Sequence, residues 1–121
     1  MDTDAARSRL VEERDRLAST LASLEDDLEA QKDSLSELST YDQHPGDIGT
    51  ETFEREKDES IAESVRASLE DIDHALGKLD DGTYGTCEIC KQPIPDARLE
   101  ALPATRYCVE HQAEMDRAAS A

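Results

Sequence analysis

The sequence predicts a mainly α-helical protein: a long antiparallel coiled-coil hairpin followed by a small zinc-finger lobe and a short C-terminal helix. Three observations lead to this fold class. Apolar residues recur at heptad spacing in two long segments, a stretch with Pro and Gly separates those segments, and cysteine and histidine residues stand at metal-ligand spacing near the C-terminus. Hydrophobic residues make up 36% of the 121 residues and aromatic residues 3%, which is too little for a wide globular core.

The first predicted helix carries a stripe of leucines at heptad spacing. From residue 10 they alternate in steps of three and four, with Arg14 and Gln31 at the two places where a leucine is missing. The stripe consists of Leu10, Leu17, Leu21, Leu24, Leu28, Leu35 and Leu38. Thr3 or Asp4 can cap the start of this helix. About four heptads of such spacing predict a long helix that packs along a partner helix.

An acidic tip loop is expected at about residues 41–50, between the two helices. Pro45 cannot continue a helix, and Gly46 and Gly49 favour turn geometry. Between residues 42 and 59, seven acidic residues stand against two basic ones. Composition alone favours a solvated hairpin end, but a loop at the end of two paired helices is also well placed to reach a partner.

The second predicted helix ends at Gly82, a residue that favours a C-terminal stop. Its apolar positions are Phe53, Ile61, Val65, Leu69, Ile72, Leu76 and Leu79. Paired residues in the two stripes have numbers that sum to between 89 and 91, as an antiparallel register requires. The pairs are Leu38 with Phe53, Leu28 with Ile61, Leu24 with Val65, Leu17 with Ile72, and Leu10 with Leu79. We therefore predict that residues 1–81 form an intramolecular hairpin in a monomeric protein, with pairing between chains as the alternative.

A metal site is predicted near the C-terminus. Two residues separate Cys87 from Cys90, two more separate Cys108 from His111, and seventeen lie between the two pairs. This spacing is typical of a tetrahedral zinc site. Four protein ligands leave no open position for catalysis, so the zinc is expected to be structural.

Residues 82–112 are assigned to this zinc finger, and residues 113–121 to the partly frayed end of a C-terminal helix. His44 in the tip loop and His74 in the second helix are alternative fourth ligands, but spacing favours His111. A redox dithiol in the first cysteine pair would need a βαβ context, which the sequence does not offer.

Composition excludes several classes of function. The 30 acidic residues outnumber the 13 basic ones and give a formal net charge of −17, which repels the phosphate backbone of DNA or RNA. Neither a signal peptide nor a membrane span is readable, so we expect no membrane association and a cytoplasmic location. Three cysteines cannot all pair within one chain, and cytoplasmic thiols stay reduced, which again favours a metal.

Two blocks of sequence carry a family resemblance. They are YGTCEICKQPIPDARLEALPATRYCVEH and the tip segment DQHPGDIGTETFEREKD. Both are similar to the DksA/TraR zinc-finger family of bacterial RNA polymerase regulators. The resemblance implies that the hairpin tip inserts into the secondary channel of RNA polymerase and modulates promoter-complex stability, without enzymatic activity and without sequence-specific DNA binding. Asp42, His44, Asp47 and Glu51 are then candidate contact residues, with Asp47 first because it aligns with a tip aspartate of the best-known member.

The chain departs from that family pattern at several positions. His111 replaces the more usual cysteine, and Lys91 replaces the glycine that commonly follows the first cysteine pair. Basic positions that help the best-known member bind the alarmone ppGpp are Asp71, Leu102 and Gln112 here. We therefore expect weak or absent dependence on ppGpp.

Other interpretations stay open at this stage. A coiled-coil scaffold with a structural zinc site would explain the heptads. A catalytic protein, either a thiol oxidoreductase or a transcript-cleavage factor, would need reactive thiols or tip carboxylates that hold Mg²⁺. Arg98 either binds a phosphate or a partner's carboxylate, or braces the zinc finger against the helices by pairing with an acid, and we favour the brace.

Overall fold

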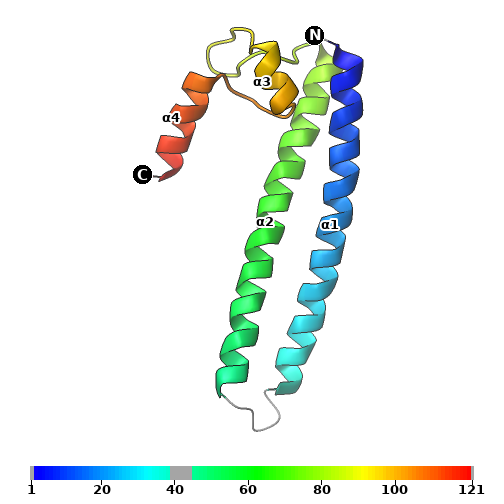
Figure 1. Ribbon diagram of the computed structural model, residues 1–121, viewed down its shortest axis with the longest axis vertical. Coiled ribbons are helices and arrows are strands. Elements are labelled where there is room, and N and C mark those ends of the chain that lie inside the picture. The colour runs from blue at the N-terminus through cyan, green and yellow to red at the C-terminus, as the bar shows by residue number, and fades with distance from the viewer. Residues whose placement is uncertain (1, 39–44, 121) are drawn as a thin grey trace. The chain divides into compact units, whose positions relative to one another are not determined.

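The computed structural model describes the backbone of residues 2–38 and 45–120 and the side chains of residues 2–32 and 52–120. Its helices are α1 (Thr3–Leu38), α2 (Pro45–Asp81), α3 (Asp96–Ala101) and α4 (Val109–Ser120) (Figure 1). The predicted fold class is confirmed, because two long helices precede the cysteine-containing segment and a short helix follows it. None of the described helices is both long and apolar enough to cross a membrane.

Helix α2 begins earlier than the sequence predicted. The expected loop at about residues 41–50 is helical from Pro45 onward, so Gly46 and Gly49 also lie within α2. The prediction treated proline as a residue that ends a helix. At the first helical position, however, proline loses no hydrogen bond and its fixed φ suits the helix, so Pro45 opens α2.

The described residues divide into two compact units. The first unit combines Met1–Asp15 with Leu69–Ala121, and the second is the continuous segment Arg16–Ser68. Both long helices contribute to both units, and each unit is described separately below.

In the first unit, the start of α1 packs against the end of α2. The buried side chains of this helix pair are Ala6, Leu10, Ile72, Ala75 and Leu76. At the edge of this apolar strip, Arg7 Nη2 lies 2.8 Å from Asp80 Oδ1. A second buried cluster, formed by Cys87, Ile94 and Leu99, belongs to the segment after α2. The first unit therefore contains a helix-pair core and a separate small core around a cysteine.

In the second unit, polar contacts join α1 and α2 in antiparallel register. Gln31 Nε2 donates to Asp58 Oδ2 at 2.7 Å, and Arg66 Nη2 donates to Glu25 Oε1 at 3.2 Å. The numbers of the paired residues sum to 89 and 91, the values that the sequence predicted. Gln31 occupies one of the two positions in the leucine stripe of α1 where a leucine is missing. Its amide makes a polar pair within the helix interface.

The inward-facing positions of α2 differ from the prediction toward the start of the helix. Phe53 is 68% exposed and Ile61 is 40% exposed, whereas Ala62 is fully buried. From Val65 toward the start of α2, the positions that face α1 are Ala62, Asp58 and Arg55, at heptad spacing. Each of these three residues is at least partly buried. Counted back from Val65, a step of three residues leads to Ala62 and a step of four leads to Ile61, and both steps suit a helical stripe. The prediction took Ile61 because it is the larger apolar residue. Phe53 and Ile61 are therefore surface residues.

The ends of the long helices are fixed by local hydrogen bonds. Asp2 Oδ1 accepts from the backbone N–H groups of Asp4 at 3.0 Å and Ala5 at 3.2 Å, so Asp2, not Thr3 or Asp4, caps α1. At the other end, Gly82 has a φ of 76° and directly follows α2. Thr83 N–H donates to the Lys78 carbonyl at 2.9 Å, which completes the expected glycine stop.

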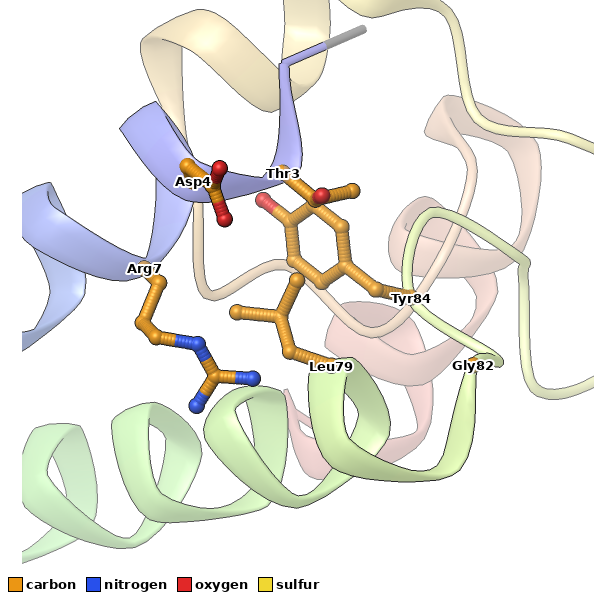
Figure 2. A pocket seen from close by; sticks show the side chains of 6 residues that line it. All are labelled: Thr3, Asp4, Arg7, Leu79, Gly82 and Tyr84. Atoms are coloured by element: carbon orange, nitrogen blue, oxygen red, sulfur yellow. The ribbon is translucent and has the colours of Figure 1, made fainter.

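A pocket of about 220 Å³ lies in the first unit where the ends of the two long helices meet. Figure 2 shows Thr3, Asp4 and Arg7 of α1 on one side and Leu79, Gly82 and Tyr84 on the other. The Tyr84 hydroxyl donates to the Pro103 carbonyl at 2.9 Å. Burial raises the pKa of this phenol and outweighs the opposite effect of the Arg9 charge. Tyr84 therefore joins the end of α2 to the segment after α3.

Candidate metal centre

The first cysteine pair lies in a tight backbone turn. Thr86 and Pro93 form an antiparallel bridge, and the Cys87 N–H donates to the Gln92 carbonyl at 2.9 Å. Within this turn, the Lys91 N–H donates to the Cys87 carbonyl at 3.0 Å. Lys91 has a φ of 63°, the left-handed conformation that normally favours glycine. Lys91 therefore occupies a position where glycine would be less strained.

The second ligand pair lies at the start of α4. Cys108 directly precedes the helix, and His111 is in its first turn. The Gln112 N–H donates to the Cys108 carbonyl at 2.9 Å, so Cys108 sits at the helix N-terminus. Residues three apart share a helix face, which turns both side chains in one direction.

These two pairs come together in space. The donor atoms of Cys87, Cys90, Cys108 and His111 all lie within 4.8 Å of one another. His111 Nδ1 lies 3.1 Å from Cys108 Sγ and 3.6 Å from Cys87 Sγ. A tetrahedral zinc site has donor separations of roughly 3.4–3.8 Å, so the four groups fit zinc with small adjustments. When bound, the ion joins the two pairs and supplies folding free energy to a segment with few apolar residues.

Backbone N–H groups favour the thiolate form of Cys87. Burial raises the pKa of the Cys87 thiol, but N–H groups of Cys90, Cys108 and Ile89 outweigh burial and lower this pKa to about 6. A hydrogen bond to Cys108 raises the pKa of His111, whereas burial has the opposite effect. A thiolate is the form of cysteine that binds metals, and Cys87 is fully buried, so an ion there is shielded from solvent.

The other two histidines are not part of this cluster. His74 pairs with Glu88, the residue after Cys87, and is not one of the four clustered donor groups. His44 lies outside the described residues. Among the residues that the structure describes, His111 is thus the histidine that joins the three cysteines.

Side chains of both long helices hold the metal-binding segment. Lys78 Nζ donates to the Thr86 carbonyl at 2.9 Å, one residue before the first ligand. Arg9 donates to the carbonyl of Glu100 in α3. Arg106, two residues before Cys108, pairs with Asp71 of α2, with 2.9 Å between Nη2 and Oδ1. Each ligand pair is therefore linked to α2 by a residue one or two positions before it in sequence.

Arg98 does not have the role that the sequence predicted. Its Nε donates to the Tyr107 carbonyl at 3.1 Å, and its Nη2 lies 3.4 Å from Thr105 Oγ1. It supports the segment before Cys108 from within the zinc finger, through a carbonyl and a hydroxyl group. The brace to the helices is the ion pair of Arg106 with Asp71, which sequence alone could not assign because it depends on tertiary packing.

The candidate tip residues are outside what the structure describes in atomic detail. Asp42 and His44 lie in the segment that is not described. Asp47 and Glu51 belong to α2, but their side chains are outside the described side chains. Their role as contact residues therefore stays a prediction.

Comparisons with known proteins match both the fold and the metal centre. Residues 82–116 match the family model described as the prokaryotic dksA/traR C4-type zinc finger. The uncharacterised protein YteA of Bacillus subtilis is 48% identical over 82 residues, which are 68% of this chain and 34% of that protein. The RNA polymerase-binding transcription factor DksA of Caulobacter vibrioides is 33% identical over 100 residues, covering 80% of this chain and 70% of that protein.

A solved structure supports the fold. The structure of transcription factor DksA2 from Pseudomonas aeruginosa covers 100% of this chain and 90% of its own, with a TM-score of 0.75 and 22% sequence identity. The chain spans about half the length, or less, of the first curated relatives that it matches.

The fold and the metal centre define a helical zinc-finger protein. Together with the sequence matches, they show that the chain belongs to the DksA/TraR family. Its finger departs from the C4 type named for the family, because the fourth member of the cluster is His111.

Proposed function

We propose that this protein regulates transcription by binding RNA polymerase directly. The observation that carries the proposal is the similarity over 100 residues to a protein named as an RNA polymerase-binding transcription factor. The helical fold and the clustered zinc-finger residues agree with such a role. RNA polymerase works in the cytoplasm, so the protein acts there.

The proposed binding mode is insertion of the hairpin tip into the secondary channel of the polymerase, where it modulates promoter-complex stability. The acidic segment between residues 42 and 59, with seven acids and two bases, suits a channel lined by basic groups. Asp42, His44, Asp47 and Glu51 are the proposed contact residues. Burying a carboxylate at such a contact is costly unless it finds a partner, so these residues would influence specificity as well as affinity.

The charge of the chain argues against direct DNA recognition. A formal net charge of −17 repels phosphate, so the protein acts on the polymerase and reads no DNA sequence. The zinc finger is a closed site with four protein ligands, which suits a structural role. We propose a regulator that works as a monomer and catalyses no reaction of its own.

The positions aligned with ppGpp-binding residues support weak or absent ppGpp dependence. Asp71 is acidic and paired with Arg106, and Leu102 is an exposed apolar residue. Gln112 Nε2 donates to Asp116 Oδ1 at 3.0 Å. A carboxylate, an alkyl group and an engaged amide offer little to a polyphosphate. Tighter polymerase binding with ppGpp, abolished by changes at Asp71 and Gln112, would contradict this part of the proposal.

The test is binding of the zinc-loaded protein to RNA polymerase core enzyme from the same source, with and without a competitor known to occupy the secondary channel. We expect binding that the competitor displaces. Asp47→Asn should alter the lifetime of promoter complexes, whereas Asp26→Asn, the same change at an exposed site on α1, should not. No binding at micromolar concentrations would overturn the proposal, and a dimeric mass in solution would then favour a coiled-coil scaffold.

A further inference from the structure

The two ring nitrogens of His111 lie beside different groups. Nδ1 lies 3.1 Å from Cys108 Sγ and 3.6 Å from Cys87 Sγ, so this nitrogen faces the position of the ion. The second ring nitrogen, Nε2, lies 4.0 Å from Glu114 Oε2. The two nitrogens therefore face different partners, sulfur on one side and a carboxylate on the other.

We infer that Glu114 is a positioning residue for the metal centre, which holds the proton of His111 on Nε2 and thereby keeps the Nδ1 lone pair directed at the ion. A neutral imidazole can bind a metal only through the nitrogen that carries no proton. An acceptor at the other nitrogen fixes both the tautomer and the angle of the ring, and such partners typically change metal affinity about 10–100-fold.

The helix supplies this partner through its geometry. Glu114 is three residues after His111 in α4, so both side chains lie on the same face of the helix. The Glu114 side chain is 59% exposed, so it can close the remaining distance by a rotamer change without disturbing a core. A cysteine at position 111 would have no second ring nitrogen, so the role proposed for Glu114 requires the histidine that this chain has there.

The experiment measures zinc affinity of the full-length protein by competition with a chromogenic chelator. Glu114→Ala should weaken zinc binding roughly 10-fold, near the lower end of the usual range because the Glu114 side chain is exposed. Glu114→Gln, which keeps an acceptor oxygen, should restore part of this loss. Glu110→Ala is the matched control, because it removes the same charge from the first turn of α4 at an exposed position.

A second background separates positioning from simple charge attraction. In His111→Cys, the ligand has no Nε2–H, so adding Glu114→Ala should leave zinc affinity unchanged. Equal losses in both backgrounds would overturn the inference, since a carboxylate that only attracts the cation would act in both. Equal affinities of Glu114→Ala and Glu110→Ala in the native background would also overturn it.

Spectroscopy reads the tautomer directly. ¹⁵N NMR of the zinc-loaded protein should show Nδ1 bound to the metal and Nε2 protonated, and zinc bound through Nε2 would contradict the inference. With Co²⁺ as the probe, Glu114→Ala should shift the visible d–d bands and Glu110→Ala should not. These readouts need no polymerase, so they succeed or fail independently of the proposed function.

Discussion

Arg106 and Asp71 form an ion pair with 2.9 Å between Nη2 and Oδ1, which ties the segment before the second ligand pair to α2. Asp71 is half exposed, so solvent screens the pair and its contribution is modest. The contact nevertheless places a charged group of the zinc finger on the same helix face that Lys78 and His74 use.

Breaking this pair should loosen the zinc finger only slightly. We expect Asp71→Asn and Arg106→Gln each to lower the free energy of unfolding of the zinc-loaded protein by less than about 1 kcal/mol. The double variant should show a coupling of roughly 0.5 kcal/mol in a double-mutant cycle measured by chemical denaturation. Strictly additive effects would mean that the pair contributes nothing.

The side of α2 that faces α1 can be tested at two neighbouring residues, Ile61 and Ala62. Ala62→Leu adds volume at a fully buried position, so it should destabilise the protein by about 1–3 kcal/mol. Ile61→Ala removes as many carbon atoms as Ala62→Leu adds, but from an exposed position, and should cost less than about 1 kcal/mol. Thermal melting followed by circular dichroism compares the two. The reverse order would restore the original prediction that Ile61 faces α1.

Lys91 offers a stabilising substitution. Its φ of 63° costs a non-glycine residue roughly 1 kcal/mol, so Lys91→Gly should stabilise the zinc-loaded protein by up to about that amount. Lys91→Ala keeps the Cβ and serves as the control, with an expected change near zero. A loss of stability in Lys91→Gly would show that the lysine side chain makes a compensating contact.

Tyr84 should make stability depend on pH in the alkaline range. The neutral phenol donates to the Pro103 carbonyl, and burial raises its pKa above the ordinary value of 10.0. A raised folded-state pKa contributes stability that is fully present below pH 10.0 and is lost as pH rises through the folded value. Tyr84→Phe should cost about 1 kcal/mol at neutral pH.

The alkaline part of that prediction has its own comparison. The stability difference between wild type and Tyr84→Phe should shrink as pH rises above 10.0, measured by denaturant titration at several pH values. Tyr107→Phe controls for the titration of other tyrosines. A difference that stays constant with pH would mean that the hydroxyl proton plays no part.

His111 is the residue on which the zinc content depends. His111→Ala should lower the zinc content and melt the segment after α2, while most of the helicity of α1 and α2 is retained. Elemental analysis and far-UV circular dichroism measure the two effects. Full retention of zinc would remove His111 from the ligand set, and His111→Cys, which restores a ligand of the C4 type, should bind zinc again.

The parts of the fold that could be predicted from sequence depend on local chemistry. The ligand pairs follow from spacing, and the donor atoms of Cys87, Cys90, Cys108 and His111 do lie close together. The antiparallel register followed from two periodic stripes, as the Gln31–Asp58 contact shows.

Other features depend on information that a single sequence does not hold. Helical periodicity accepts both Ile61 and Ala62 as a step from Val65, and only packing against α1 selects the smaller residue. Pro45 was read as a helix breaker because its position relative to the helix start was unknown. Arg98 in α3 and Arg106 before α4 are both arginines near the second ligand pair, and tertiary structure decides which of them pairs with an acid of α2.

The division of the chain has a consequence for the order in which the protein folds during synthesis. The first unit joins Met1–Asp15 to Leu69–Ala121, so the buried Leu10 can reach its final surroundings only after the end of α2 has been made. The second unit is one continuous segment and can fold while translation is still in progress. The ribosome therefore releases the start of α1 long before the residues that cover it exist, and zinc capture by all four ligands must wait for Cys108 and His111.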